Sequence, residues 1–275
     1  MFSLWCFVIH KIKQQYPFYR ILFFFLSLNL ILSSCSNYNE IIKGDDYVKK
    51  FELANALFDD DEFLKSIVLY EQIYQHAPKS GEGELAYYRL GRSYYNSEDY
   101  YMAGYYFSSY IQRFPYSANN EELMFLAAMC KVQNSPELSL DQTETEDAIN
   151  AVQIFVDSYP TTVLMDSCNQ IIDRLRQKIE TKEFNNVMLY AQTEMYRAAV
   201  ASAEIFLEKY PSSIHAEEAF STMVRNSYYL TVNSIESKKS TRIDETIERM
   251  RKFEADFPGS DDIKSLNQLV NKLLN

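Results

Sequence analysis

Residues 80–115 read SGEGELAYYRLGRSYYNSEDYYMAGYYFSSYIQRFP, and this stretch decides the fold. From Tyr87 to Tyr94 its apolar and small side chains recur at the i, i+3, i+4 and i+7 spacing of one helix face. From Tyr100 to Tyr110 the same spacing returns after a short polar break. The stretch therefore predicts two helices joined by a tight turn.

A short signal built on proline recurs along the chain and divides it into repeats. Each instance is an apolar or aromatic stretch, then Pro, any residue, and Ser or Thr. The residue before a proline disfavours helix, and a Ser or Thr hydroxyl can accept from the free N–H groups that begin the next helix. Each signal therefore predicts a helix end followed by a capped helix start. The five instances are Pro78 with Ser80, Pro115 with Ser117, Pro160 with Thr162, Pro211 with Ser213, and Pro258 with Ser260.

The quoted stretch resembles a tetratricopeptide repeat (TPR). That family places a large aromatic residue, Leu-Gly and Tyr on its first helix, then Ala, an aromatic residue and Pro on its second. The matching residues are Tyr87, Leu90, Gly91, Tyr94, Ala103, Phe107 and Pro115. Because Gly91 and Ala103 are small, the two helices can approach closely. The resemblance implies an all-α fold, an α-solenoid of about five TPR-like hairpins with a C-terminal capping helix.

The other four repeats match less fully and extend the array over residues 46–275. The fifth keeps the pattern at Ile243 and Phe253. Polar segments around Gln133–Glu146 and Ser234–Thr241 predict loops between helices, and the first helix of the fourth repeat extends across Ser167–Lys182. A last helix, Asp261–Leu274, is expected to cover the open end of the array, because terminal repeats need a cover.

Composition points away from enzymes and nucleic-acid binding. The chain of 275 residues carries a formal net charge of −11, so bulk charge does not favour binding to phosphate backbones. Six Gly and three His leave little material for phosphate loops, metal sites or nucleophilic catalysis. The 22 Tyr instead favour an aromatic-packed interaction protein. We predict no catalytic residue, no metal and no cofactor.

The first 34 residues predict a cleaved signal peptide. They contain no Asp or Glu, and three basic residues precede the apolar run Ile21–Leu32. A membrane-spanning helix needs about 20 apolar residues, so the run suits the core of a secretory signal. It ends in Leu32-Ser33-Ser34-Cys35, which resembles the lipobox of bacterial lipoproteins. The resemblance implies cleavage before Cys35 and its lipidation by a diacylglycerol and an acyl chain such as palmitate. An ordinary signal peptide with a coincidental Cys is the alternative.

The predicted domains are the signal peptide at 1–34, a lipidated tether at 35–45 and the TPR solenoid at 46–275. Ser36 follows the lipidated residue, where an Asp often retains lipoproteins in the inner membrane. The resemblance to bacterial lipoproteins therefore implies a location at the periplasmic face of the outer membrane, with the lipid as anchor.

Lipobox, short tether and five hairpins together resemble the BamD family, lipoproteins of the outer-membrane β-barrel assembly machinery. The resemblance implies a non-enzymatic scaffold. It would bind the barrel-inserting (BamA-like) subunit through that subunit's periplasmic domains, and it would receive unfolded β-barrel precursors. The alternatives are another periplasmic TPR lipoprotein, for cell-envelope or division coordination, and an enzyme or nutrient-binding lipoprotein on a TPR core.

A candidate peptide-binding face lies beside the core positions of two first helices. Aromatic side chains there would give large contact area at low entropy cost. Tyr88 and Tyr95 could instead pack against the neighbouring repeat, and Arg92 could pair with a peptide carboxylate or with a nearby Glu. The candidate residues are Phe51, Asn55, Phe58, Tyr88, Arg92 and Tyr95.

Two other features are set aside as functional sites. Gly81-x-Gly83-x-x-Ala86 looks like a dinucleotide fingerprint, but it lies between two helical hairpins instead of following a strand. Cys130 and Cys168 are predicted to be free, buried thiols, because their offset along neighbouring helices, about 10 Å at 1.5 Å per residue, exceeds disulfide reach.

Overall fold

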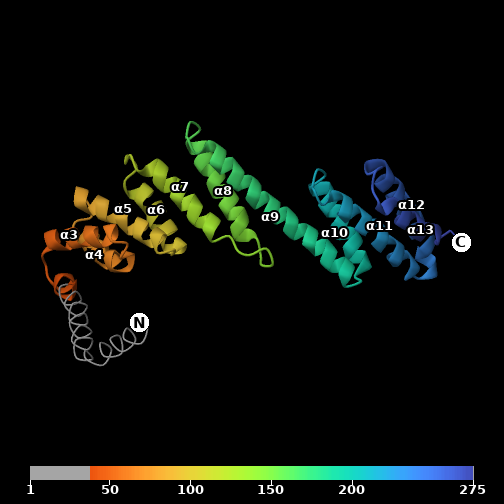
Figure 1. Cartoon of the computed structure of the whole chain (residues 1–275), viewed down its shortest axis with the longest axis horizontal. Helices are drawn as coiled ribbons and strands as arrows, with labels where there is room; N and C mark the ends of the chain where they lie inside the picture. The colour runs from red at the N-terminus through yellow and green to blue at the C-terminus, as the bar shows by residue number, and fades with distance from the viewer. Residues whose placement is uncertain (1–37, 275) are drawn as a thin grey trace, which may run out of the picture. The chain divides into compact units, whose positions relative to one another are not determined.

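The computed structural model describes residues 38–274, so Cys35 and the expected signal peptide lie outside the described residues. Within 38–274 every regular element is an α-helix (Figure 1). The described chain falls into two compact units, 38–130 and 131–274. The prediction of an all-α fold is confirmed.

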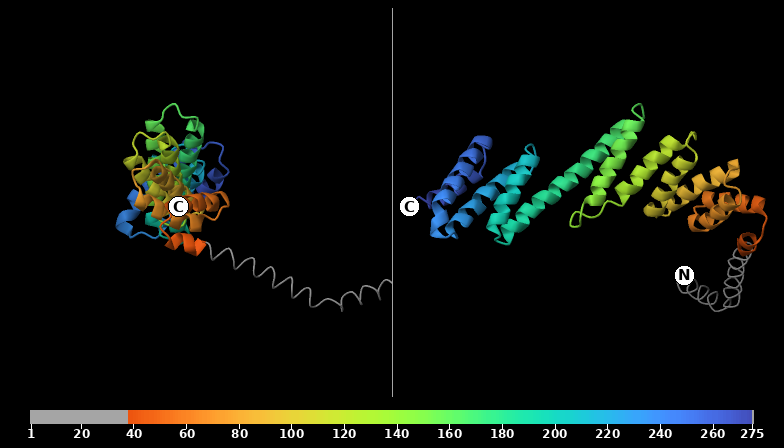
Figure 2. Two further views of the ribbon diagram at one scale, coloured as in Figure 1. Left: turned by 90° about the vertical axis from the view of Figure 1, so that its left-hand side faces the viewer. Right: turned by 180° about the vertical axis from the view of Figure 1, so that it is seen from behind.

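Each unit is built from helices that pack on their neighbours in the chain. In the first unit α3 packs on α4, α4 on α5 and α5 on α6, and Leu123 of α7 joins the same core. The bounds are α3 Tyr47–Asp59, α4 Phe63–His76, α5 Gly81–Asn96 and α6 Tyr100–Arg113, with α7 at Asn120–Gln133. Consecutive helices lie side by side as hairpins, as the views of Figure 2 also show.

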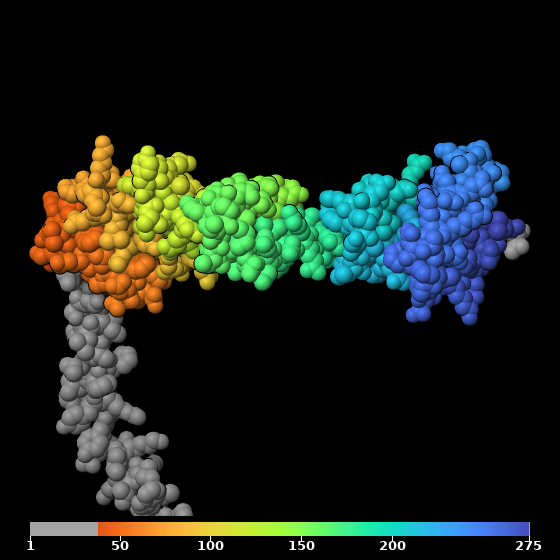
Figure 3. Space-filling model, turned by 90° about the horizontal axis from the view of Figure 1, so that it is seen from above, coloured from red at the N-terminus to blue at the C-terminus, as the bar shows by residue number. Residues whose placement is uncertain are grey.

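The second unit continues the same order of neighbours. Helices α8 through α12 pack in sequence, and α13 covers both α11 and α12. Within each unit, segments that follow one another in the chain also lie next to one another in the space-filling view (Figure 3). This stacking confirms the prediction of an α-solenoid of hairpins with a terminal covering helix. The bounds are α8 Thr143–Ser158, α9 Met165–Gln192, α10 Tyr196–Lys209, α11 Ala216–Val232, α12 Glu236–Asp256 and α13 Asp262–Asn271.

The five prolines end helices as predicted. Helices α4, α6, α8, α10 and α12 each end two residues before a proline, and the residue between them donates its N–H to the carbonyl four residues back. A proline cannot donate this bond, so the helix cannot continue through it.

The prediction of capped helix starts is right at one proline and wrong at four. Ser80 Oγ accepts from Gly83 N at 3.0 Å and caps α5. The other four hydroxyls instead accept from the N–H two residues on, at 2.9–3.4 Å. This local turn places the next helix start one to two residues beyond the expected place. Those four residues are Ser117, Thr162, Ser213 and Ser260.

The core repeats in register with the prolines. Counted back from each proline, the twelfth residue is small and fully buried: Ser66, Ala103, Ala148, Ala199 and Thr246. The match at Ile243 is therefore three residues out of register, because Thr246 holds the small position and Ile243 is half-buried. The predicted close approach is confirmed in the second hairpin, where a Cβ on Gly91 would meet the Phe107 ring at 2.8 Å.

The predicted loop at Ser234–Thr241 is wrong, because α12 begins at Glu236. Lys239 pairs with Glu236 at 3.0 Å within the first turn of that helix. Arg242 also reaches back to Ser234 Oγ and so ties the helix to the turn before it. The predicted loop around Gln133–Glu146 is present at 134–142, and the predicted long helix at Ser167–Lys182 lies within α9.

Residues 38–43, within the expected tether, form a helical segment on the first hairpin. Tyr38 OH donates to Lys65 O at 3.1 Å, and Lys50 Nζ donates to Ile42 O at 3.0 Å. Ile41 and Ile42 pack against the core of the first unit. The folded part of the chain therefore begins at most three residues after Cys35.

Cys130 and Cys168 are free and buried, which confirms the prediction made for them. Cys130 belongs to the first unit and Cys168 to the second. Burial raises the pKa of both thiols, that of Cys130 to about 12. Both thiols are therefore protonated and unreactive at neutral pH.

Candidate functional site

The candidate residues on α3 form a half-buried polar and aromatic cluster. Asn55 Oδ1 accepts from Tyr70 OH at 2.9 Å and from Arg89 Nη1 at 2.8 Å. The Arg89 guanidinium also lies over the Phe58 ring, 5.2 Å from its centroid. Phe51 packs against the core of the first unit. Asn55 and Phe58 thus both contact Arg89 of α5, a residue that the sequence analysis did not single out.

The candidate residues Tyr88 and Arg92 of α5 both contact Glu122 of α7. Tyr88 OH donates to the two carboxylate oxygens of Glu122 at 3.0 and 3.1 Å, and Arg92 forms an ion pair with the same carboxylate. Burial raises the pKa of Tyr88, while Arg92 acts against that rise. Of the two partners considered for Arg92, the structure shows the Glu. A peptide carboxylate would have to displace it.

Tyr95, the remaining candidate, packs against the second helix of its own hairpin. Its ring meets Tyr100 edge-on at 5.5 Å between centroids and Phe107 at 6.0 Å. Burial raises the pKa of Tyr95. All six candidates are half-buried, so each exposes part of its side chain while the rest packs internally.

Two of these contacts could not be read from periodicity. Arg89 and Arg92 lie on α5 three residues apart, yet Arg89 contacts α3 and α4 while Arg92 contacts α7. Glu122 stands in the acidic first turn of α7, a place explained equally well by the helix dipole. Spacing on one helix does not say which neighbouring helix a long side chain reaches.

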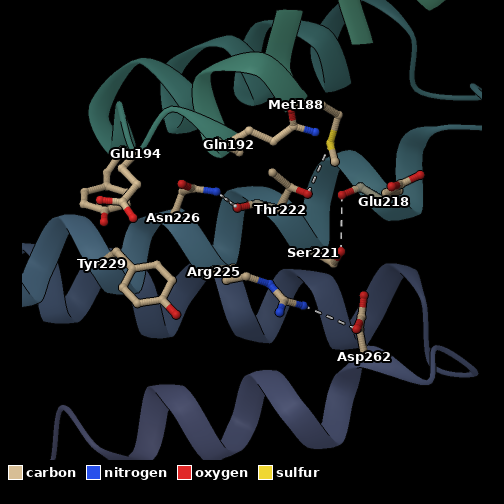
Figure 4. A pocket seen from close by; sticks show the side chains of 12 residues that line it. Met188, Gln192, Glu194, Glu218, Ser221, Thr222, Arg225, Asn226, Tyr229 and Asp262 are labelled. Carbon is tan, nitrogen blue, oxygen red and sulfur yellow. Dashed lines mark hydrogen bonds and ion pairs between the residues drawn. The ribbon is translucent and has the colours of Figure 1, made fainter. Parts of the chain in front are cut away.

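A separate cavity of about 530 Å³ lies within the second unit (Figure 4). Its walls come from the C-terminal part of α9, the start of α10, the face of α11 and the first residue of α13. No candidate residue was predicted there. The lining residues are Met188, Ala191, Gln192, Glu194, Tyr196, Glu218, Ser221, Thr222, Arg225, Asn226, Tyr229 and Asp262.

Within residues 38–274, no group of three or more His, Cys, Asp or Glu could hold a metal ion. Among the helices of this same part, none combines the length and the apolar character that crossing a membrane requires.

Stacked helix hairpins with half-buried aromatic and charged clusters define a helical-repeat protein, a class that commonly binds other chains through its surface. A family model described as YfiO, outer membrane lipoprotein, matches residues 49–243. The match covers most of the chain and parts of both units, so the chain belongs to this family of outer membrane lipoproteins.

Known proteins resemble the chain at low identity. The outer membrane protein assembly factor BamD of Caulobacter vibrioides is 22% identical over 181 residues, which are 66% of this chain and 59% of that protein. The chain thus spans less than two thirds of this curated relative.

Two solved structures are TPR proteins. One, from Thermus thermophilus, is 15% identical, covers 83% of this chain and 98% of its own, and has a TM-score of 0.32. The other, from Bacteroides fragilis, is 10% identical, covers 84% and 99%, and has a TM-score of 0.38.

Proposed function

We propose that this chain is a BamD-like, non-enzymatic scaffold of the outer-membrane β-barrel assembly machinery. It binds the barrel-inserting subunit through that subunit's periplasmic domains and helps β-barrel proteins insert into the outer membrane. The observation that carries the proposal is the family match over residues 49–243, together with the similarity to an assembly factor. A stack of hairpins supports it, because such a stack offers a long surface to several partners.

The anchor in this proposal is lipid on Cys35. The apolar run and the Leu-Ser-Ser-Cys sequence support it, as does membership of a lipoprotein family. Tyr38 lies three positions after Cys35, and three residue steps span at most about 11 Å. Lipid on Cys35 would therefore hold the first unit close to the membrane surface.

The surface offered to unfolded barrel precursors is the face of α3 and α5 that carries the six candidate residues. Their half-exposed rings provide apolar contact for aromatic segments of variable sequence. The Arg92–Glu122 pair gives the same face one cation and one anion. Either residue can therefore exchange its partner within the protein for a charged group of a peptide.

The assembly role is tested by purifying the tagged chain from solubilised outer membranes. We expect a large β-barrel protein with periplasmic repeat domains to copurify, and depletion of the chain to lower the levels of many outer-membrane barrel proteins. Normal barrel levels after depletion, with no barrel protein captured, would contradict the proposal.

The precursor surface is tested by photo-crosslinking in intact membranes. A crosslinker at position 88 or 95 is expected to capture unfolded barrel precursors. Tyr101 is the matched control, because it is a more exposed tyrosine, on α6. Equal capture from position 101 would show that the candidate face has no preference for precursors.

A further inference from the structure

The walls of the cavity in the second unit are rich in hydrogen-bond acceptors. Three lining side chains on α11 are almost fully buried, and each donates one hydrogen bond to another residue of the lining. Ser221 Oγ donates to Glu218 O at 3.2 Å, Thr222 Oγ1 to Met188 Sδ at 3.7 Å, and Asn226 Nδ2 to Thr222 O at 2.8 Å. The oxygens of these side chains remain available to a ligand that donates.

Asn226 is the clearest case of such an available oxygen. Its side chain is only 4% exposed, and no described residue donates to its Oδ1 atom. Its residue lines the cavity, and Figure 4 shows its amide between Thr222 and the end of the cavity where Glu194 lies. This oxygen is not among the buried polar atoms that lack a partner, so it is accessible from the cavity and can accept from a donor there.

The charge of the lining is negative at both ends. Figure 4 shows Glu194 at one end of the cavity and Glu218 with Asp262 at the other. The single cation in the lining is Arg225, whose Nη2 atom pairs with Asp262 Oδ1 at 3.5 Å. Within 38–274 neither Glu194 nor Glu218 forms an ion pair, so two negative charges of the lining remain uncompensated.

Aromatic faces border the same end as Glu194. The rings of Tyr196 and Tyr229 stack with centroids 5.4 Å apart and planes 26° from parallel. Burial and the neighbouring Glu194 carboxylate raise the pKa of Tyr196. Tyrosine faces beside carboxylates attract planar cations, which stack on the ring while donating to the acids.

We infer that this cavity binds an arginine side chain presented by a segment of a protein partner. A guanidinium supplies five donors in a planar fork and a delocalised positive charge, which match the acceptors, the excess of carboxylates and the stacked rings. The volume lies in the range of sites that take more than a single ion, so neighbouring residues of the segment enter with the arginine. The inference names the side chain that the scaffold would recognise on a partner. It rests on the proposed scaffold role in one respect, that the partner is a protein.

The test measures binding of a blocked tripeptide, Ac-Gly-Arg-Gly-NH2, to the full chain purified in detergent. The comparison peptide carries citrulline, which has nearly the shape of arginine but no charge. We expect the arginine peptide to bind at least tenfold more tightly in calorimetry, to weaken as NaCl is raised, and to shift the methyl NMR signals of Met188 and Thr222.

Matched variants locate the site. Glu218→Gln and Glu194→Gln should each weaken arginine binding about threefold to fivefold, the upper part of the range for an exposed ion pair. Glu217→Gln makes the same charge change one residue away on α11, outside the lining, and should leave the affinity unchanged. Circular dichroism of each variant checks that it is folded.

Several outcomes would overturn the inference. These are equal binding of the citrulline peptide, an equal loss in Glu217→Gln and Glu218→Gln, or tighter binding of a lysine peptide or of spermidine. None of these outcomes would contradict the assembly role, which the copurification and depletion experiments test separately. Conversely, arginine binding in the purified chain would stand even if no barrel protein copurified.

Discussion

At the scale of single residues, two glycines in the first turn of α5 have opposite surroundings. A Cβ on Gly83 would lie 2.0 Å from the carbonyl oxygen of Ala77, whereas a Cβ on Gly81 would meet nothing within 4 Å. Backbone cannot move aside as a side chain can. The two glycines that superficially look like a nucleotide motif are therefore explained by packing at Gly83 and by an open helix start at Gly81.

These surroundings predict opposite effects of the same substitution. Gly83→Ala should lower the free energy of unfolding by about 2–3 kcal/mol, the upper part of the range for overpacking. Gly81→Ala, its control, should leave stability equal or raise it by up to about 1 kcal/mol, because alanine restricts the unfolded chain. Urea unfolding followed by circular dichroism measures both. A stable Gly83→Ala protein would mean that α5 starts differently.

The buried Cys130 thiol predicts a pH dependence of stability. Its pKa is about 12 in the folded protein against 9.0 for a free thiol, so the folded state holds the proton more tightly. The stabilisation is fully present below pH 9 and is lost as pH rises from 9 toward 12.

Between pH 9 and 11, the free energy of unfolding should therefore fall more steeply in the wild type than in Cys130→Ala. The difference in slope should be at most about 1.4 kcal/mol per pH unit. Urea unfolding of both proteins under reducing conditions tests this, and the tyrosines common to both cancel in the comparison. Parallel slopes would indicate that the thiol is not buried.

At the scale of elements, three hairpin turns share one geometry. The residue after the C-cap of α3, α5 and α9 is in the left-handed region, and the two hydrogen bonds of a Schellman motif close each turn. Glycine usually takes this place, yet the chain has Asp61, Glu98 and Glu194 there, with φ of 57–63°. The polar break before Tyr100 placed the turn between α5 and α6 correctly, but no glycine marked the conformation of any of the three turns.

Glu98→Gly should relieve this strain. Left-handed backbone destabilises a residue with a Cβ by about 1–2 kcal/mol, and glycine avoids this cost. Because glycine also makes the unfolded chain more flexible, part of this benefit is cancelled, and the free energy of unfolding should rise by about 0.5–1 kcal/mol. Glu98→Ala is the control, since it removes the carboxylate and keeps the Cβ. Thermal unfolding separates the two explanations: a gain in both variants would point to charge instead of backbone.

The loop 134–142 is held on α9 by two lysines one turn apart. Lys178 Nζ donates to Ser135 Oγ at 2.8 Å and to Pro136 O, and Lys182 Nζ donates to Ser139 O at 2.7 Å. A polar stretch predicted the loop, but nothing in its composition indicated which helix would hold it.

Lys178→Met should release this loop. Hydrogen bonds from a charged donor contribute about 1.5–3 kcal/mol, so amide exchange across 134–142 should become at least tenfold faster. Arg176→Met, which removes an exposed cation of the same helix, should leave exchange in the loop unchanged. Unaltered protection in Lys178→Met would show that the lysine is not what orders the loop.

At the scale of the whole molecule, the proposed anchor predicts where the protein is found. Cys35→Ala should abolish labelling by radioactive palmitate and release the protein from sedimented membranes, while the helical circular dichroism spectrum stays the same. Two or more acyl chains hold a protein firmly on a membrane, and the variant would carry none. Ser36→Ala is the control and should stay membrane-bound. Membrane binding of Cys35→Ala would contradict the lipid anchor.

Membership in the outer membrane lipoprotein family agrees with the resemblance that the repeats and the lipobox suggested. The candidate site shows the limit of such reasoning. Periodicity placed Tyr88 and Arg92 beside the core face of α5, and there they lie, but it left open that Glu122, 30 or more residues later, would engage both.

The order of helices, their ends at the prolines and their small contact residues were determined by the sequence itself, because helical period and proline sterics act within a few residues. Only the tertiary structure decided that Arg89 reaches Asn55, that Glu122 reaches Arg92, and that residues between 188 and 262 line an acceptor-rich cavity. These contacts join positions about 30 to 70 residues apart, and the way neighbouring hairpins stack brings them together. No local spacing carries that information.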